Sequence, residues 1–391
     1  MPVPASPVVV ISRRGEERIR RGHPWIYRSD VLSATAAPGD LVAVVGGRDR
    51  RLGEALWSAR SQIALRMMSV GDDAPGESVW RHRLAAAIAF RDLLHIDATA
   101  YRVVHGEADR LPSLVVDKYG DYLVVQALSQ GTDRRLPELT LALVELMSPK
   151  GILARNDPKV RTLEGLEQSV QVLHGEVPSA VQVREGAVDY SVDLRHGQKT
   201  GLFLDQRENR VAAGCYARGR MLDCFSYNGA FGLSLARHCS DVIAIDASAD
   251  AVARITENAG LNGVTNVMAR EANVFDELRH FEQSGERFNT IVLDPPAFAK
   301  NKAAVEKALT GYKDINLRAL RLLEPGGVLV TCSCSYNVDE ATFLGVLQAA
   351  AADAGASMTV EERRMQSKDH PVLITVPETA YLKCVILRKS G

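Results

Sequence analysis

Two short runs in the last third of the chain carry side chains that could do covalent chemistry together. Asp294 begins the run Asp-Pro-Pro-Ala-Phe, at the end of a predicted strand that starts at Thr290. Cys334 lies in the run Cys-Ser-Cys-Ser, after a predicted strand that starts at Val328. If the two strands are parallel neighbours, as sequential strands usually are, their ends lie about 5 Å apart. A carboxyl group and a thiol would then share one pocket.

This pair suits methylation at C5 of a cytosine. C5 of a pyrimidine is a poor nucleophile, and attack of a thiolate on C6 turns the ring into an enamine-like species that can accept a methyl group. A protonated Asp294 could hydrogen-bond N3, after which a base removes the C5 proton and Cys334 leaves. The target base must also leave its stack. The structural alternative for Cys334 is an inert buried thiol, and Cys332 is a second candidate because alternation along a strand would place it on the same face.

A second set of residues follows three predicted strands and could hold a cofactor. Asp223 ends the first strand, and Gly229 in the following turn lets the backbone approach a ligand closely. Asp246 ends the next strand, where an acid can accept hydrogen bonds from two ribose hydroxyls. Asn273 lies just after the end of the third strand and is expected near an adenine. The run Gly-x-Gly-x-x-Gly is missing here, so a ligand with ribose but no phosphate, such as S-adenosylmethionine, fits best; the plain alternative for each acid is a helix cap.

Alternating strands and helices must position these residues. From about Asp189 the pattern predicts a parallel α/β sheet with right-handed crossovers, whose ligands bind beyond the carboxyl ends of the strands. Its predicted strands are Arg220–Cys224, Asp241–Asp246, Asn266–Arg270, Thr290–Asp294 and Val328–Cys332.

The first half of the chain predicts two smaller parts. Short strands in the N-terminal part indicate a β-rich module, and they are expected at Val8–Ile11, Leu41–Val45, Gly53–Trp57 and Ile63–Met68. A Gly-Pro-rich linker at 71–76 precedes an α+β middle part. That part has predicted helices from Ser78 to Leu94 and from Leu136 to Met147, and strands near Val103, Leu114–Val116, Tyr122–Ala127 and Val181–Val183. We therefore predict domains at 1–72, 73–187 and 188–391.

Composition narrows the class of protein further. A chain of 391 residues with 46% hydrophobic and 24% charged residues is typical of a soluble protein of two or three domains. No secretion signal or membrane-spanning stretch is evident, so we expect a cytoplasmic protein with no membrane contact. The six cysteines form no Cys-x2-Cys pair, which favours reduced thiols and no metal site. The net charge of -1 conceals a basic region, because residues 1–70 hold 11 Arg, no Lys and 6 acids. Arginine suits contacts to phosphate, and a solvated surface is the plain alternative.

Together these motifs resemble a known family. Gln198–Arg207 (QKTGLFLDQR), Asp223–Tyr227 (DCFSY), Asp294–Phe298 (DPPAF) and Ser333–Ser335 (SCS) are similar to motifs of the bacterial RlmI-like 23S ribosomal RNA cytosine-C5 methyltransferases. His23–Tyr27 (HPWIY) resembles the RNA-binding PUA domain of that family. The resemblance implies a PUA domain, a small central α+β domain and a Rossmann-like class I methyltransferase domain.

The resemblance also implies roles for particular residues. Cys334, which matches the Ser-Cys-Ser pattern, would be the nucleophile, with Asp294 as its partner at the pyrimidine. S-adenosylmethionine would be held by residues from five segments, namely Phe203, Gln206, Arg207, Asp223, Phe225, Tyr227, Asn228, Gly229, Asp246, Asn273 and Asp294. Asn273 stands where such enzymes often have Asp, and its oxygen can still accept from an adenine amine. Ala230 stands where a second glycine is common.

Other functions remain open from the sequence. Asp-Pro-Pro followed by an aromatic residue also resembles the motif of nucleobase N-methyltransferases, which need no thiol. A non-catalytic RNA-binding assembly factor is a third reading. The implied partner is ribosomal RNA, 23S in particular, with Arg13, Arg14, Arg20 and Arg21 as a docking surface, and a homodimer is left open. His370-Pro371 and Glu378 are expected only in a closing hairpin of the sheet.

Overall fold

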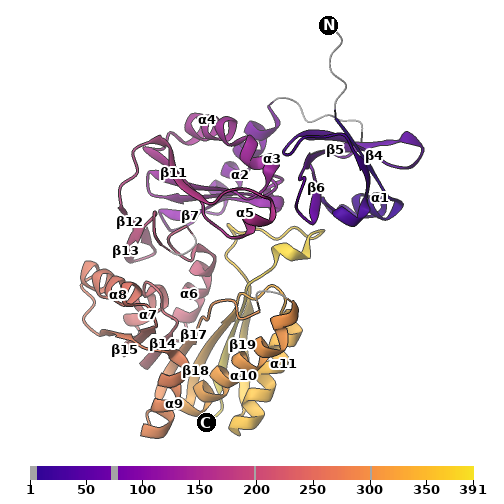
Figure 1. The fold of residues 1–391 in the computed structure, drawn as a ribbon. Helices are drawn as coiled ribbons and strands as arrows, with labels where there is room; N and C mark the ends of the chain where they lie inside the picture. The colour runs from indigo at the N-terminus through magenta and orange to yellow at the C-terminus, as the bar shows by residue number, and fades with distance from the viewer. Residues whose placement is uncertain (1–6, 72–77, 198–199, 300–301) are drawn as a thin grey trace. The chain divides into compact units, whose positions relative to one another are not determined.

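The described chain divides into two compact units that interleave along the sequence (Figure 1). The structure is a computed structural model and describes residues 7–71, 78–197, 200–299 and 302–391. The first unit contains Met1–Val181, Val192–Leu202 and Asp369–Thr379, and the second contains Gln182–Ser191, Phe203–Lys368 and Ala380–Gly391. The predicted domain boundaries after residues 72 and 187 stay predictions, and most of the predicted linker at 71–76 lies outside the described residues.

The N-terminal part of the first unit is a β-sheet that confirms the predicted β-rich module. Its strands lie in the order β2-β6-β5-β4-β1-β3. Alternate residues such as Val42 and Val44 are buried, as expected for strands with one face on a core. The strands are β1 (Val8–Ile11), β2 (Trp25–Tyr27), β3 (Val31–Ala34), β4 (Leu41–Val45), β5 (Arg51–Trp57) and β6 (Ile63–Met67).

A short helix between the first two strands of this part was not predicted from the sequence. Helix α1 (Arg13–Arg20) begins after Ser12, whose hydroxyl accepts a hydrogen bond from the backbone NH of Gly15 at 3.3 Å. Its only buried large apolar side chain is that of Ile19. A single apolar residue produces no helical stripe, so hydrophobic periodicity could not reveal this helix.

The rest of the first unit is built on a mixed sheet in the order β11-β10-β9-β8-β7. Helices α2 and α4 cover it, and Trp80, Leu84, Leu139 and Leu143 lie in its core. Both helices and the predicted strands are confirmed, whereas β10 was missed because its fully buried sequence ends in polar residues. The elements are α2 (Val79–Leu93), β7 (Ala100–His105), β8 (Leu114–Tyr119), β9 (Tyr122–Ala127), α3 (Gln130–Arg134), α4 (Leu136–Met147), β10 (Gly151–Asn156), α5 (Val160–Leu163) and β11 (Ser169–Gly175). A separate hairpin follows, β12 (Ala180–Glu185) and β13 (Val188–Asp193), and most of its residues belong to the second unit.

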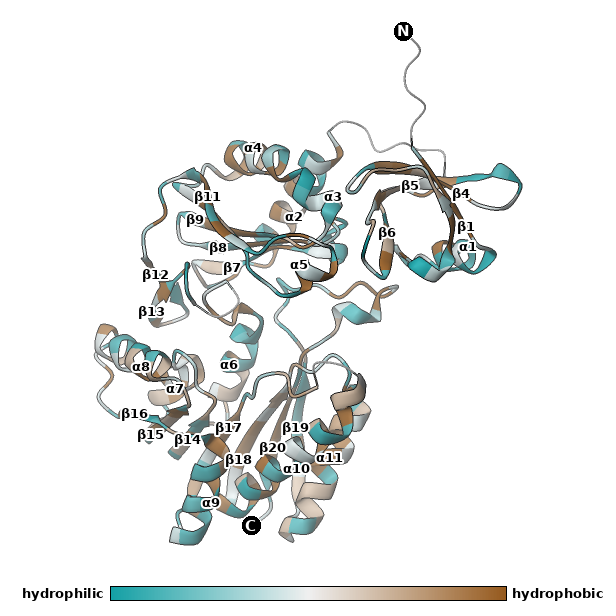
Figure 2. Ribbon diagram, viewed as in Figure 1, coloured by the Kyte–Doolittle hydropathy of each residue, from teal (hydrophilic) through white to brown (hydrophobic). Residues whose placement is uncertain are grey.

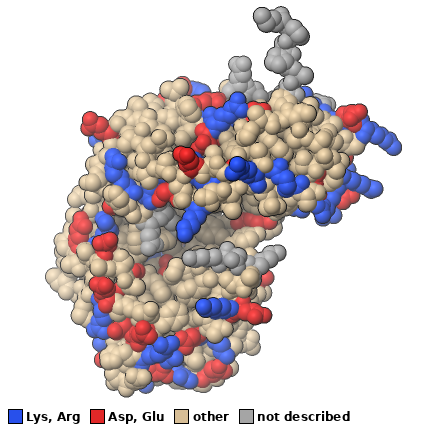
Figure 3. Space-filling view, viewed as in Figure 1, with Lys and Arg blue, Asp and Glu red and all other residues tan. Residues whose placement is uncertain are grey.

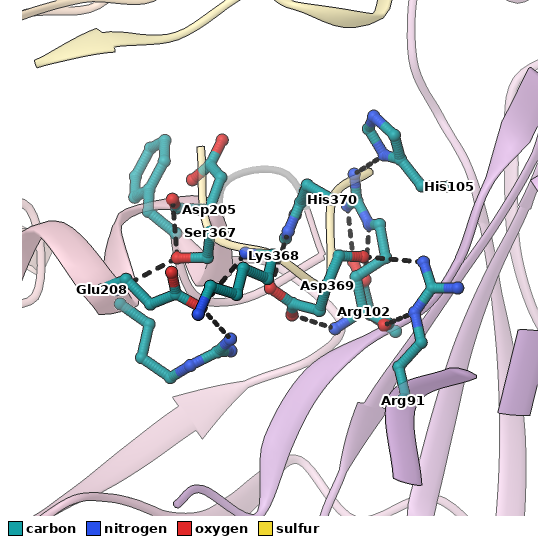
Figure 4. Close-up of polar contacts among 12 residues, drawn as sticks. Arg91, Arg102, His105, Asp205, Glu208, Ser367, Lys368, Asp369 and His370 are labelled. Atoms are coloured by element: carbon teal, nitrogen blue, oxygen red, sulfur yellow. Dashed lines mark hydrogen bonds and ion pairs between the residues drawn. The ribbon is translucent and has the colours of Figure 1, made fainter. Parts of the chain in front are cut away.

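The segment Asp369–Thr379 belongs to the first unit, which corrects the expectation that His370 and Glu378 lie in a closing hairpin of the second sheet. Two arginines hold its first residue (Figure 4). Arg91 Nη2 donates to the carbonyl oxygen of Asp369 at 2.7 Å, and the backbone NH of Arg102 donates to the Asp369 carboxylate at 2.8 Å. These long-range polar contacts leave no signature in local sequence.

The second unit contains the predicted α/β sheet. Its strand order is β16-β15-β14-β17-β18-β20-β19, and the first five strands are parallel. All five predicted strands are confirmed, while β20 runs antiparallel to both β18 and β19. The central strands are among the most hydrophobic segments (Figure 2). The elements are α6 (Arg207–Gly214), β14 (Gly219–Cys224), α7 (Ala230–Ala236), β15 (Cys239–Asp246), α8 (Ala249–Leu261), β16 (Val267–Glu271), α9 (Val274–Ser284), β17 (Phe288–Leu293), α10 (Val305–Leu322), β18 (Leu323–Ser333), α11 (Glu340–Ala354), β19 (Met358–Arg364) and β20 (Lys383–Lys389). Across the described residues, no helix has the length and apolar character needed to span a membrane.

Candidate active site

The predicted site residues gather at one edge of the parallel sheet in the second unit. In the register of the sheet, Leu293 on β17 lies opposite Cys224 on β14 and Thr331 on β18. The carboxyl ends of these parallel strands therefore meet at the same edge. Asp294 follows β17 directly, and Cys334 follows β18 directly.

The loop between β14 and α7 adopts an unusual backbone conformation. Phe225, Tyr227 and Gly229 have positive φ angles of 62°, 53° and 80°. Two of these residues carry side chains, for which this region is sparsely populated and costs free energy. The backbone NH of Ser226 donates to the carbonyl of Ile245 at 3.0 Å, which ties the loop to β15. Such locally strained backbone is common at ligand-binding sites.

Asp223 lies buried beneath this loop. Its Oδ2 accepts a hydrogen bond from the backbone NH of Gly232 at 2.9 Å, and the residue is 1% exposed. Burial is the largest cause that raises the pKa of Asp223, to about 7, and the nearby carboxylates Asp294 and Asp246 act in the same direction. A side chain at position 232 would place its Cβ 3.0 Å from Asp223 Oδ2. Glycine therefore favours the close approach of helix α7 to this carboxylate.

Asp246 and Asn228 present polar atoms around the same loop. Asp246 Oδ2 accepts from the backbone NH of Tyr227 at 2.9 Å, and Oδ1 accepts from the backbone NH of Ser248 at 3.0 Å. A carboxylate has lone pairs left for further donors after two such bonds. Asn228 is 1% exposed, and neither polar atom of its side chain has a hydrogen-bond partner within the described part of the chain. A buried amide in this state is costly unless a ligand satisfies it, so the loop suits a polar ligand.

The segment before α6 joins the two halves of the site. Gln206 Nε2 donates to Asp294 Oδ1 at 2.8 Å, and the Phe203 ring lies edge-on to Tyr227 with ring centroids 5.2 Å apart. Arg207 is buried, with Nη2 3.8 Å from a carboxylate oxygen of Glu208. The first two residues of the QKTGLFLDQR motif, Gln198 and Lys199, lie outside the described residues. The remainder of the motif reaches both the cofactor loop and the acid of the DPPAF motif.

Asn273 has a structural role of its own. It is the N-cap of α9, and its Oδ1 accepts from the backbone NH of Phe275 at 2.9 Å. This cap orders the helix that follows β16. The contact of Asn273 with an adenine stays a prediction.

The Cys334 loop is held by a network of hydroxyl groups. Cys334 Sγ lies 3.7 Å from the carbonyl oxygen of Pro295, the residue after Asp294. The hydroxyl of Tyr312 on α10 lies 3.0 Å from that of Ser333 and 2.9 Å from that of Ser335. The thiol therefore stands against the DPPAF segment, and both of its neighbours are fixed. Tyr312 was missed in the sequence because nothing near it marks contacts with residues 21 and 23 positions later in the chain.

Cys332 occupies a different environment from Cys334. It is fully buried, lies opposite Cys384 in the sheet and packs in the core with Val292 and Val330. Burial raises the pKa of the Cys332 thiol well above its usual value. The prediction that both cysteines share a face stays a prediction, because Cys334 lies one residue beyond the end of β18. Cys334 is the half-buried thiol of the two.

Family comparisons agree with this geometry. Residues 9–70 match the family model of a PUA-like domain. Residues 125–388, more than half of the chain, match that of an S-adenosylmethionine-dependent methyltransferase.

Individual relatives and solved structures extend the match to nearly the whole chain. The chain is 39% identical over 394 residues to ribosomal RNA large subunit methyltransferase I of Tolumonas auensis, covering 98% of this chain and 99% of the relative. It is 38% identical to the enzyme of the same name from Vibrio cholerae, covering 97% and 98%. A SAM-dependent methyltransferase structure from Streptococcus mutans has a TM-score of 0.83 at 19% identity and covers 97% of this chain and 99% of its own. A methyltransferase structure complexed with SAH has a TM-score of 0.84 at 20% identity, with the same coverage. The two structures share the fold.

Proposed function

This chain belongs to the ribosomal RNA large subunit methyltransferase I family of S-adenosylmethionine-dependent methyltransferases, and on that premise we propose that it methylates C5 of a cytosine in 23S ribosomal RNA. The observation that carries the proposal is the contact of Cys334 Sγ with the carbonyl of Pro295, 3.7 Å away and next to Asp294. A thiol and a carboxyl group at one sheet edge are what the chemistry of C5 requires.

S-adenosylmethionine is the cofactor of this family, and the residues present fit it. When bound, it supplies a methyl group on a positively charged sulfonium. Asp246 would accept hydrogen bonds from the ribose, and the unpartnered amide of Asn228 would meet the polar methionine end. Phe203, Gln206, Arg207, Phe225, Tyr227, Gly229 and Asn273 would complete the site together with Asp223 and Asp294.

Cys334 and Asp294 have separate roles in the proposed reaction. Cys334 attacks C6 as a thiolate, its sulfur forms a bond to that carbon, and electron density moves to C5. Asp294 accepts a hydrogen bond from Gln206 Nε2 at 2.8 Å, and in its protonated form it would donate a hydrogen bond to N3 of the cytosine, which stabilises the charge that develops on the ring. After methylation a base removes the C5 proton, and the carbon–sulfur bond breaks to release Cys334.

The rival chemistry is methylation of an exocyclic nitrogen. Asp294, followed by two prolines and an alanine before Phe298, is also compatible with a site that holds an amine. Nitrogen methylation needs no thiol, so Cys334 distinguishes the two reactions. The half-buried position of Cys334 beside the DPPAF segment favours carbon methylation.

The test uses tritiated S-adenosylmethionine and deproteinised ribosomal RNA from cells that lack the protein, with nucleoside analysis of the product. Wild type and Cys332→Ala are expected to form 5-methylcytidine, and Cys334→Ala is expected to form none. Label in another nucleoside, or full activity of Cys334→Ala, would support nitrogen methylation instead. No label, together with no cofactor binding by calorimetry, would support a non-catalytic assembly factor.

We further infer that the protein works in the cytoplasm, where ribosomal RNA is made in bacteria. Homodimer formation stays a prediction, which light scattering of the purified chain would check.

A further inference from the structure

A buried lysine lies beside the Cys334 loop. Lys383 begins β20, pairs with Ser333 in the antiparallel register of β18 and β20, and is 8% exposed. Its Nζ donates to the carbonyl oxygen of Ser335 at 2.8 Å and to that of Tyr381 at 2.9 Å. The ammonium group therefore binds the backbone carbonyl of Ser335, the residue that directly follows Cys334.

Burying a lysine is costly unless its charge is compensated. Two carbonyl oxygens satisfy hydrogen bonds but carry only partial charge, so a negative group nearby is needed to offset desolvation. The anionic groups that act on Lys383 are Cys334 and Asp339, the N-cap of α11. Asp339 is exposed, so solvent screens its charge, and its Oδ1 also accepts from the backbone NH of Thr342 at 2.8 Å. Cys334 is the other partner, and it gains negative charge only as a thiolate.

We propose that the Lys383 ammonium is the positioning residue that stabilises Cys334 as a thiolate and fixes the loop that presents it. This inference rests on the proposed role of Cys334 as the nucleophile. The thiol proton passes to solvent, and Lys383 keeps its own proton throughout. The thiolate attacks, not the thiol, so a cation at this position raises the reactive fraction.

Two other titratable groups lie around the Cys334 loop, and neither favours ionisation of the Cys334 thiol. The hydroxyl of Tyr312 on α10 also contacts Ser333 and Ser335, and burial raises the pKa of Tyr312, so it stays neutral. Asp294 follows β17 next to Pro295, where a negative charge would disfavour a thiolate. Lys383 is therefore the cation among the groups named here that favours ionisation of Cys334.

The titration of Lys383 is compatible with this role. Burial lowers the pKa of Lys383 to about 8, and the negative charges of Cys334 and Asp339 partly oppose that effect. At neutral pH most of the lysine is still protonated. The cation is thus present where the thiolate is needed, and it is lost as the pH rises above about 8.

Lys389 on the same strand provides a matched control. Its Nζ also donates to two carbonyl oxygens, those of Leu320 at 2.8 Å and Leu323 at 2.6 Å. It stands six residues along β20 from Lys383, a separation of roughly 20 Å in an extended strand. A purely structural lysine on β20 is therefore available for comparison.

The experiment measures alkylation of Cys334 by iodoacetamide as a function of pH, with the modified peptide quantified by mass spectrometry. Full-length wild type is compared with Lys383→Met, Lys383→Gln, Lys383→Arg and Lys389→Met. Removing the positive charge in Lys383→Met is expected to slow Cys334 alkylation roughly tenfold at pH 7, with little change at pH 10, where the thiol ionises unaided. Lys383→Gln keeps a donor for the Ser335 carbonyl and should still be slow, whereas Lys383→Arg should recover most of the rate.

Equal Cys334 alkylation in wild type and Lys383→Gln would overturn the inference, as would an equal loss in Lys389→Met. If Lys383→Met does not fold, Lys383→Gln and Lys383→Arg alone decide between charge and hydrogen bonding. The methylation assay separates this inference from the proposed function. If Cys334→Ala abolishes 5-methylcytidine while Lys383→Gln alters neither alkylation nor methylation, only the role of Lys383 fails.

Discussion

At the scale of single residues, the site contains three aspartates, and the surroundings of each one give it a different role. Asp223 is buried under a loop and hydrogen-bonded to Gly232, whereas Asp246 is half-buried and holds the loop through two backbone NH groups. Asp294 is oriented by Gln206. The same residue type thus serves as a buried acid, a loop anchor and a partner of the nucleophile. Environment determines these differences, and sequence alone shows only the positions.

The raised pKa of Asp223 predicts a pH-dependent stability. An ordinary Asp has a pKa near 4, and burial raises that of Asp223 to about 7, so the folded state holds a proton that the unfolded state has released in this window. Stability should therefore fall by up to about 1.4 kcal/mol per pH unit between roughly pH 4 and pH 7 because of this group. Asp223→Asn removes the titration, and its amide oxygen can still accept from Gly232.

Urea unfolding at pH 5 and pH 8 without cofactor measures this effect. Wild type should lose more stability between the two pH values than Asp223→Asn, and the variant should bind S-adenosylmethionine more weakly at pH 8. If wild type and Asp223→Asn lose the same unfolding free energy between pH 5 and pH 8, Asp223 is ionised throughout this pH range.

At the scale of elements, hydrophobic pattern and turn residues predicted the strands and the turn that carry the candidate site. The five parallel strands and the Gly229 turn were evident because buried parallel strands give short apolar runs, followed here by polar residues at their ends. Helix α1 and strand β10 were missed because their patterns are not periodic. Tyr312 and Lys383 were missed because they reach the Cys334 loop through tertiary packing.

Close packing of α7 on β14 leads to a prediction at this scale. Gly232→Ala would place a methyl group 3.0 Å from Asp223 Oδ2 and displace the carboxylate or the helix. We expect at least tenfold weaker binding of S-adenosylmethionine and a loss of stability of roughly 1–3 kcal/mol. Isothermal calorimetry and thermal unfolding measure both quantities.

Gly260 on α8 is the control, because a Cβ there meets nothing within 4 Å. Gly260→Ala should be neutral or stabilise the protein by up to about 1 kcal/mol through helix propensity. Similar effects of the two substitutions would contradict the packing argument.

At the scale of the whole molecule, the sequence predicted the order of the parts but not their interleaving. Motifs predicted a PUA-like start and a methyltransferase from residue 188 on, and the family models of a PUA-like domain and a methyltransferase match residues 9–70 and 125–388. The return of Asp369–Thr379 to the first unit depends on contacts such as that of Arg91 with Asp369, separated by 278 residues. No local pattern encodes such a contact.

The arginines exposed in the N-terminal part lead to a prediction about RNA binding. Figure 3 shows Lys and Arg side chains over the part of the first unit where α1 lies. Arg13, Arg14, Arg20 and Arg21 are all exposed, and Arg14 also pairs with buried Asp30, which gives it a structural role as well. Replacing Arg13, Arg20 and Arg21 by Ala should weaken ribosomal RNA binding roughly tenfold or more and reduce its salt dependence.

Filter binding at several salt concentrations checks this, with cofactor affinity as a test of folding. Arg237→Ala with Arg287→Ala, at exposed positions in the second unit, serves as the control. Equal RNA affinity of the triple variant and wild type would remove α1 from the docking surface.

The covalent bond between Cys334 and the target base is the central claim, and trapping it is the most direct measurement. Fluorine at C5 of cytidine blocks the final proton removal, so the adduct accumulates. Wild-type protein and Cys332→Ala, incubated with S-adenosylmethionine and 23S ribosomal RNA transcribed with 5-fluorocytidine, should form a protein–RNA species that survives denaturing electrophoresis. Cys334→Ala should form none. A stable species that persists in Cys334→Ala, or its absence in wild type under conditions that methylate ordinary RNA, would contradict the account.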